Sequence, residues 1–308
     1  MILCCGEALI DMLPRETAAG EAAFAPHAGG AVFNTAIALG RLGAQTGFFS
    51  GLSTDLFGEV LTDALAASHV DSSLAERSAR PTTLAFVKLV DGQASYAFYD
   101  ENTAGRMLAP QDLPALPPSV TALFFGGISL VGEPCGSAYE ALMTREAGKR
   151  VTMIDPNIRP GFIADEAAYR GRIGRMAALA DIVKLSDEDL RWLQGDGDIP
   201  TLAQPLLAKG AKAVLVTEGA KGAHGFTAKG HAFAPARSVV VADTVGAGDT
   251  FNAGVLAALS RAGLLTGKAL AEGLAPEALE PALALGCAAA AITVSRAGAN
   301  PPWAEELP

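Results

Sequence analysis

The 308-residue sequence predicts an α/β fold: a doubly wound, mainly parallel sheet flanked by helices, with a small additional β-sheet as a lid. Three observations predict it. Hydrophobic residues make up 50% of the chain, which is typical of a packed globular body. Short apolar runs alternate with longer segments of helical period, as in parallel strands that helices cover on both faces. Two further stretches lack the helical period, and we expect them to form the lid.

The elements of the main sheet follow in order along the chain. Apolar runs rich in branched residues predict buried strands at residues 1–5, 46–50, 122–125, 151–155, 182–185 and 213–217. The helical period predicts helices at residues 32–42, 137–148, 166–180, 187–193, 202–209 and 249–262. We expect one domain over residues 1–308, with ligands bound beyond the carboxyl ends of the strands.

The two stretches that break this alternation are residues 15–27 and 82–99. The second predicts a hairpin, because two β-rich arms flank a turn at Asp91 and Gly92. Together the stretches predict lid strands inserted at about residues 13–28 and 80–103. A decorative hairpin at the sheet edge is the alternative that the pattern leaves open.

The composition excludes several classes of partner. With 23 basic and 33 acidic residues, the net charge is −10, so the surface repels nucleic acid and anionic lipid. The longest apolar run, residues 282–294, is shorter than the roughly 20 residues that span a bilayer. Four scattered cysteines without a C-x-x-C pair do not make a disulfide framework. We therefore expect a cytoplasmic protein with small-molecule ligands, no nucleic acid partner and no membrane.

The string DTVGAGDTFNAG at residues 243–254 carries the strongest chemical signal. Its glycine turn leads directly into a predicted helix, whose free N–H groups and positive dipole end make an anion site. A carboxylate at that turn opposes a bound phosphate. Asp249 therefore fits better as a base that takes the proton of an attacking hydroxyl. Simple capping of the helix by Asp249 is the alternative.

Polar residues that suit a hydroxylated ligand lie near the N-terminus. Gly29 and Gly30 let the backbone approach a ligand closely, and Asn34, one turn into the next helix, can both donate and accept hydrogen bonds. Asp11 comes directly after the first predicted strand. The alternatives are a buried polar residue for Asn34 and a solvated loop residue for Asp11.

These strings resemble the two signatures of the PfkB, or ribokinase-like, family of carbohydrate kinases. Residues 243–254 resemble the C-terminal signature and residues 29–43 the N-terminal one, while no Walker A loop or G-x-G-x-x-G fingerprint occurs. The resemblance runs from Gly6 to Gly298 and implies a ribokinase-like fold. It also implies transfer of the γ-phosphate of ATP to a primary hydroxyl of a sugar. The catalytic residues implied are Asp249 as base, with Gly246, Ala247, Gly248 and Arg159 around the phosphoryl group.

The string Asp155-Pro-Asn157-Ile-Arg159 resembles one branch of the family, which contains the fructokinases and 2-keto-3-deoxygluconate kinases. Arg159 is then the cation beside the phosphate, and a surface arginine is the alternative. Many 2-keto-3-deoxygluconate kinases have an arginine where this chain has Asp100, which favours a neutral sugar, fructose first. 2-Keto-3-deoxygluconate kinase, then ribokinase or nucleoside kinase, and a catalytically idle sugar sensor remain alternatives. The resemblance implies sugar contacts by Asp11, Gly29, Gly30, Asn34, Phe98, Asn157 and Asp249.

The resemblance also implies a nucleotide side and two metal ions. Nucleotide contacts are expected at Lys184, Ser186, Thr217, Gly219, Gly222, Gly246 and Gly248. The family's N-x-x-E occurs here as Ser186-x-x-Asp189, so either Asp189 or Glu188 orders the waters of Mg²⁺. A K⁺ site is expected at Asp243, Val245, Thr293 and Gly298, with an alanine-rich buried helix near residue 290 as the alternative. Exposed lid strands would allow a homodimer through the lid.

Overall fold

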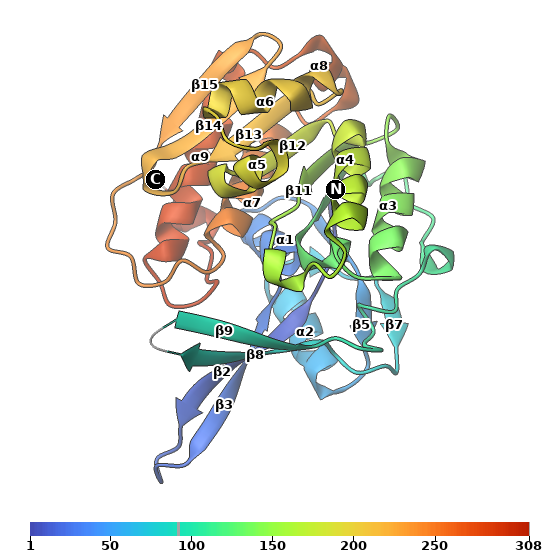
Figure 1. Ribbon diagram of the computed structural model, residues 1–308, viewed down its shortest axis with the longest axis vertical. Helices are drawn as coiled ribbons and strands as arrows, with labels where there is room; N and C mark the ends of the chain where they lie inside the picture. Colours follow the sequence, from blue (N-terminus) through green and yellow to red (C-terminus); the bar gives the residue numbers. More distant parts are fainter. Residues whose placement is uncertain (91–92, 308) are drawn as a thin grey trace.

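A nine-stranded sheet forms the centre of the structure, a computed structural model that describes residues 1–90 and 93–307 (Figure 1). The strand order is β15-β14-β13-β12-β11-β10-β1-β4-β6. All pairs from β6 to β13 are parallel, and β14 and β15 are antiparallel. The predicted mainly parallel sheet is therefore confirmed. Its strands are β1 (Ile2–Cys5), β4 (Thr46–Phe49), β6 (Val70–Asp71), β10 (Ala122–Gly126), β11 (Val151–Asp155), β12 (Ile182–Ser186), β13 (Ala213–Thr217), β14 (Gly222–Thr227) and β15 (Gly230–Pro235).

All six predicted strands of the main sheet are present, with ends that differ by at most one residue. The hairpin of β14 and β15 was not predicted, because glycines interrupt its apolar pattern. One of them, Gly225, leaves room for a helix: a Cβ there would lie 2.5 Å from the Leu279 side chain. The glycines that conceal these strands in the sequence therefore let a neighbouring element pack onto the sheet.

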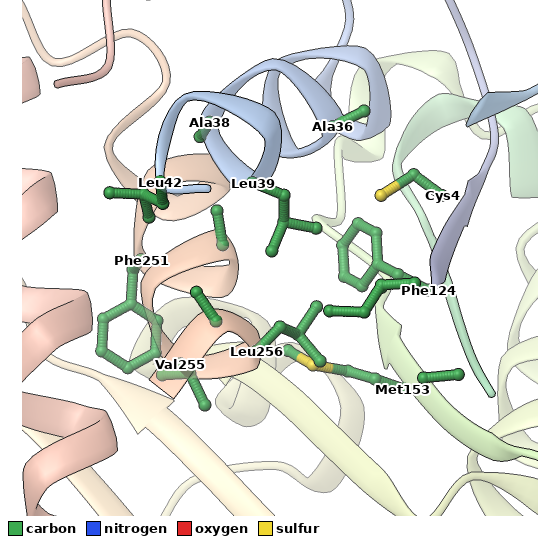
Figure 2. Close-up of a cluster of buried hydrophobic side chains, with 14 of the residues drawn as sticks. Cys4, Ala36, Ala38, Leu39, Leu42, Phe124, Met153, Phe251, Val255 and Leu256 are labelled. Atoms are coloured by element: carbon green, nitrogen blue, oxygen red, sulfur yellow. The ribbon is translucent and has the colours of Figure 1, made fainter. Parts of the chain in front are cut away.

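Helices cover both faces of the sheet. On one face, Leu39 of α1, Leu42 directly after this helix, and Phe251 and Leu256 of α7 lie among core residues of the sheet such as Phe124 (Figure 2). The other face is covered by α3 to α6. The helices are α1 (Ala31–Arg41), α2 (Leu56–Ala67), α3 (Cys135–Glu146), α4 (Glu166–Leu179), α5 (Asp187–Gln194), α6 (Ile199–Ala208), α7 (Ala247–Arg261), α8 (Gly267–Glu272) and α9 (Pro276–Val294). Short 3₁₀ turns are η1 (Pro110–Asp112), η2 (Gly127–Leu130), η3 (Pro160–Phe162), η4 (Gly219–Lys221) and η5 (Ala304–Glu306).

Helices α7 and α9 cross with their backbones in contact. A Cβ on Gly254 of α7 would lie 2.6 Å from the Cα of Gly286 in α9. By length and apolar composition α9 is similar to a membrane-spanning helix, but half of its apolar 18-residue stretch is buried inside the fold. We interpret α9 as a core helix, in line with the alternative that the sequence left open for this segment.

The lid is a four-stranded sheet with the order β3-β2-β8-β9 in the described part of the chain. Its strands are β2 (Leu9–Glu16), β3 (Ala22–Gly29), β8 (Leu84–Val90) and β9 (Gln93–Tyr99), and it projects from the main body in Figure 1. Because β2 pairs with β8, both predicted stretches form one sheet. The expected turn at Asp91 and Gly92 lies outside the described residues. A separate pair, β5 (Gly51–Ser53) and β7 (Glu76–Ser78), lies beside α2.

One prediction about the lid needs correction. Its first strand begins at Leu9, earlier than predicted, so Asp11 lies within β2 and not directly after the first strand of the main sheet. The main-sheet strand β1 already ends at Cys5. The apolar residues Leu9 and Ile10 therefore belong to the lid, where their burial continues the apolar pattern of β1.

Candidate functional site

A cavity of about 520 Å³ lies between the lid and the main sheet, large enough for a small ligand. Its walls come from the start of α7, the first turns of α1, the loop after β11 and the lid. Of the residues predicted from the sequence, the lining includes Asp11, Gly30, Asn34, Phe98, Asn157, Arg159, Val245, Gly246, Ala247, Gly248 and Asp249. Segments from both signature strings thus meet around one space.

The glycine turn before α7 adopts the geometry that the string suggests. Gly246 is the N-cap of α7 and has a positive φ of 79°. A Cβ on it would also lie 2.8 Å from the side chain of Ala299, so the turn requires glycine. The residues of the turn and of the first helical turn line the cavity. Free N–H groups at a helix start of this kind provide an anion site.

Asp249 is buried at the start of α7, with 8% of its surface exposed. Its Oδ2 accepts a hydrogen bond of 2.9 Å from Nδ2 of Asn34, and no side chain caps the helix. The capping alternative for Asp249 is therefore wrong. Burial raises the pKa of Asp249 to about 7, the charge of Asp155 adds to this, and the hydrogen bond from Asn34 opposes it. A carboxyl with that pKa can accept a proton near neutral pH.

A buried ion pair lies beneath the start of α7. Lys184 Nζ is 2.9 Å from Asp155 Oδ2, which also accepts a hydrogen bond of 2.7 Å from Asn252 Nδ2. Lys184, predicted as a nucleotide contact, therefore faces Asp155 and does not line the cavity. Its Nζ nevertheless lies close to the helix start, because a Cβ on Gly248 would be 3.2 Å from it. The ion pair and the Asn252 hydrogen bond join β11, β12 and α7 next to the glycine turn.

Asp189 and Glu188, the two acidic residues expected to hold the waters of Mg²⁺, differ in their environment. Asp189 is buried, and burial together with the charge of Asp155 raises its pKa. Glu188 is exposed. Ser186 Oγ accepts a 3.0 Å hydrogen bond from the N–H of Asp189 and so caps α5. No group of three His, Cys, Asp or Glu residues within 1–90 and 93–307 is arranged to hold a metal ion by itself.

The lid contributes a carboxylate and an aromatic ring to the cavity. Asp11 is paired with Ala85, and Ala85 with Phe98, so Asp11 and Phe98 point to the same face of the lid. Burial raises the pKa of Asp11 to about 6, which a solvated loop residue would not show. A Cβ on Gly29 would lie 2.3 Å from Asp11 Oδ2, so this glycine makes room for the carboxylate. The rings of Phe98 and Phe162 meet edge to face at 4.6 Å.

Arg159 supplies the positive charge in a lining that is otherwise acidic. It is exposed toward solvent and cavity, and its Nη1 donates a 2.9 Å hydrogen bond to the carbonyl of Ile158. Among the lining residues in the described part of the chain, it is the one arginine or lysine, beside the carboxyls of Glu7, Asp11, Asp155 and Asp249. Asn157 lines the cavity with a positive φ of 45°. Such a lining suits a ligand that donates hydrogen bonds and carries no carboxylate of its own.

The other predicted nucleotide contacts lie at the same edge of the sheet but outside the cavity lining. Ser186 and Thr217 are register partners at the ends of β12 and β13. Gly219 has a positive φ of 53° in the following turn. Gly222 is explained by packing, because a Cβ on it would lie 2.2 Å from the carbonyl oxygen of Ala234.

The segments predicted for K⁺ come together in the structure. Asp243 Oδ1 accepts a 3.0 Å hydrogen bond from the N–H of Val245, and Oδ2 accepts one of 2.9 Å from the N–H of Gly298. Thr293 Oγ1 donates to Thr250 Oγ1 at 3.0 Å. The turn before α7 and the loop after α9 are therefore joined by the Asp243 carboxylate.

Two carboxylates of the cavity lining, Asp155 and Glu7, were not predicted as site residues. Asp155 belongs to the quoted D-x-N-x-R string, but its role depends on Lys184 and Asn252, which are distant in sequence. Glu7 is buried and follows β1. Its position directly after a predicted strand was the available signal.

Comparison with known proteins identifies the family. Residues 1–306 match the pfkB family carbohydrate kinases. The chain is a member of this family. This carbohydrate kinase is 59% identical to a fructokinase from Rhizobium leguminosarum bv. trifolii over 271 residues, which cover 88% of this chain and 83% of the relative.

Solved structures of related kinases have the same fold. The carbohydrate kinase matches a fructokinase from Xylella fastidiosa with bound ATP at a TM-score of 0.85 and 31% identity, covering 97% of this chain and 93% of that one. It also matches a fructokinase double mutant from Vibrio cholerae O395 in a fructose, ADP and potassium ion bound form. That match has a TM-score of 0.84 and 25% identity, over 97% and 93% of the two chains. The predicted ribokinase-like fold and family are confirmed.

Proposed function

We propose that this carbohydrate kinase is a fructokinase, which transfers the γ-phosphate of ATP to a primary hydroxyl of fructose. The observation that carries the proposal is the position of Asp249, buried at the cavity wall, at the start of α7, with a pKa of about 7. A base at a helix start can deprotonate a hydroxyl next to the place where a phosphate binds. The 59% identity to a fructokinase supports fructose as the acceptor.

In the proposed mechanism the sugar lies between the lid and α1. Asp11, Asn34, Asn157, Phe98 and the backbone at Gly29 and Gly30 orient it, and Asp249 accepts the proton of its primary hydroxyl. The N–H groups from Gly246 to Asp249 and the guanidinium of Arg159 stabilise the charge on the transferred group. Closure of the lid over the sugar would exclude water and suppress ATP hydrolysis.

The nucleotide is proposed to lie along the ends of β12 and β13, contacting Lys184, Ser186, Thr217, Gly219 and Gly222. Mg²⁺, when bound, would neutralise part of the charge on the phosphates of ATP. The buried Asp189 is the better placed of the two candidate acids to hold its waters, since Glu188 is exposed. For K⁺ we propose Asp243, Val245, Thr293 and Gly298, because the structure joins these segments.

The acidic lining favours a neutral sugar. The family resemblance derives this preference from Asp100, but Asp100 pairs with Arg106 and lines a separate cavity of about 30 Å³. The preference therefore depends on Glu7, Asp11 and Asp249, which would repel the carboxylate of 2-keto-3-deoxygluconate. In the proposed mechanism, Arg159, the cation of the lining, contacts the transferred phosphate and is not free to pair with a sugar carboxylate.

We further propose a single kinase domain over residues 1–308 that forms a homodimer through its lid in the cytoplasm. Two lid aromatics support the dimer, because Phe24 and Tyr99 are 48% and 59% exposed. Four free, buried cysteines fit a reducing compartment. Sedimentation of the purified protein should give the dimer mass, and a monomer at micromolar concentration would contradict the lid interface.

The test of the function is a coupled ADP-release assay with fructose, 2-keto-3-deoxygluconate, ribose and adenosine as separate acceptors. Fructose should give the highest kcat/KM. A higher value with one of the other acceptors would overturn the assignment of the sugar. No acceptor-dependent release of ADP with any of the four compounds would instead indicate a sensor that binds sugar without phosphorylating it.

A further inference from the structure

Glu7 lies between two glycine turns at the end of the main sheet. It follows β1, is 9% exposed and lines the cavity. Its Oε1 accepts a 2.9 Å hydrogen bond from the N–H of Ala31, the first residue of α1. Its Oε2 accepts one of 3.2 Å from the N–H of Ser129 in η2, after β10. One carboxylate thus joins the start of α1 to the turn that follows another strand.

Helix α1 needs this contact because it has no cap of its own. Its N-cap is Gly30, which has no side chain to accept from the first N–H groups, and the first turn contains no acidic residue. Glu7 supplies both the missing acceptor and a negative charge at the positive end of the helix dipole. The start of α1 is therefore fixed by a residue 24 positions earlier in the chain.

Both flanking turns are shaped around Glu7. Gly127 has a positive φ of 68°, and a Cβ on it would lie 2.1 Å from Glu7 Oε1. Gly30 has a φ of 111°, and a Cβ on it would lie 2.9 Å from the Glu7 carbonyl oxygen. Neither turn has room for a side chain while Glu7 holds its place.

We propose that Glu7 is a positioning residue for the sugar. It acts through α1, which carries Asn34, and through the turn that carries Ile128; both residues line the cavity. Each carboxylate oxygen of Glu7 accepts a backbone N–H group, and these two bonds are the route by which Glu7 acts on the sugar in this proposal. A displacement of α1 would move Asn34 away from the sugar and from Asp249. This inference rests on the proposed sugar kinase function.

The test is Glu7→Gln, which keeps the shape of the side chain but turns one acceptor into a donor. One buried N–H then loses its partner, and because the start of α1 is no longer held in place, the kcat/KM for fructose should decrease about tenfold. The decrease should arise mainly from a higher KM for fructose, with the KM for ATP changed less than about twofold. Glu7→Asp keeps the charge but is shorter, so it should recover part of the loss. An unchanged fructose KM in Glu7→Gln would overturn the proposal.

Glu146→Gln is the matched control for loss of a buried glutamate. Glu146 is 5% exposed and pairs with Arg145 at 2.8 Å and with Arg150, at the end of α3. Its replacement should lower the free energy of unfolding and leave the fructose KM unchanged. If Glu146→Gln raises the fructose KM as much as Glu7→Gln does, the effect comes from a general loss of stability, and the proposal fails.

A second pair of variants serves if Glu7→Gln does not fold. Gly127→Ala places its methyl group against Glu7 Oε1, whereas Gly148→Ala has a similar φ of 76° and nothing within 4 Å. Only Gly127→Ala should raise the fructose KM. The wild-type acceptor is established first. If it is another sugar, the fructose assignment fails, and the same KM comparison with that sugar still tests Glu7.

Discussion

Asn34 Nδ2 donates a 2.9 Å hydrogen bond to Oδ2 of Asp249, although the two residues are 215 positions apart. The bond joins α1 to the start of α7, and both residues line the cavity. In the proposed mechanism, the same amide group contacts the sugar and lowers the pKa of Asp249. Substrate binding and proton acceptance would then depend on one contact.

Replacement of Asn34 should shift the pH dependence of the kinase. The base must be deprotonated to act, so with a pKa of about 7 the kcat/KM for fructose should fall as the pH drops below about 7. The Asn34 hydrogen bond lowers this pKa. In Asn34→Ala the acid limb should therefore move to higher pH, and the fructose KM should rise. A pH–rate profile with an unmoved acid limb would contradict the assignment of the base.

Asp249→Asn should lower the activity of the kinase and raise its stability at alkaline pH. Loss of the base should reduce turnover by about 10²–10⁴, with both KM values near those of the wild type. Because the pKa is raised in the folded state, the folded protein binds more protons than the unfolded chain between about pH 4 and about 7, so wild-type stability falls as the pH rises through this range. The variant lacks this loss and should be more stable than the wild type at alkaline pH. Urea unfolding at two pH values tests the second half of the prediction.

Lys184→Met should destabilise the fold. It leaves the Asp155 carboxylate buried without its cation, with the amide of Asn252 and the N–H of Asn157 as hydrogen-bond donors, a change that typically costs about 3–5 kcal/mol. Lys184 also lowers the pKa of Asp249, so the acid limb of turnover should move to higher pH. Addition of Asp155→Asn should restore part of the free energy of unfolding. Equal free energies of unfolding in urea for Lys184→Met and the wild type would show that the Lys184–Asp155 pair does not stabilise the fold.

Arg159→Lys tests the cation of the lining. Lysine keeps the charge but loses the planar fork, so turnover should fall by roughly 10- to 100-fold, the range of a charged hydrogen bond. Arg80→Lys is the control, because Arg80 is exposed and lies outside the cavity lining. Equal turnover of the two variants would place Arg159 outside the reaction.

Asp189→Asn and Glu188→Gln together test the proposed metal position. The buried Asp189 should matter more, so Asp189→Asn should need a higher Mg²⁺ concentration for half-maximal turnover, and Glu188→Gln should match the wild type. Chelation of divalent ions should stop both enzymes. The reverse order of the two variants would assign the waters to Glu188.

The sequence predicted the elements that depend on local pattern. Buried strands and the glycine turn at Gly246 are visible in short windows, because burial and positive φ restrict the residues directly. Gly222 and Gly225 made β14 harder to predict, because glycine is uncommon in strands. These glycines are required by close packing against β15 and α9, which the local sequence does not show.

The missed features depend on contacts across the chain. Glu7 binds the N–H groups of Ala31 and Ser129, which are 24 and 122 positions away. Asp155 meets Lys184 and Asn252 at separations of 29 and 97. The position of Asp11 within the lid likewise follows from the pairing of β2 with β8. No local pattern specifies such partners.

The close contact of Gly254 with Gly286 joins α7, which carries the proposed base Asp249, to the core helix α9. A Cβ on Gly254 would lie 2.6 Å from the Cα of Gly286, so the backbones of α7 and α9 are closely packed at this point. In the proposed mechanism, the lid would then be the part that moves, because it carries the proposed sugar contacts Asp11 and Phe98 on the other side of the cavity. The position of the base would be set before any ligand binds.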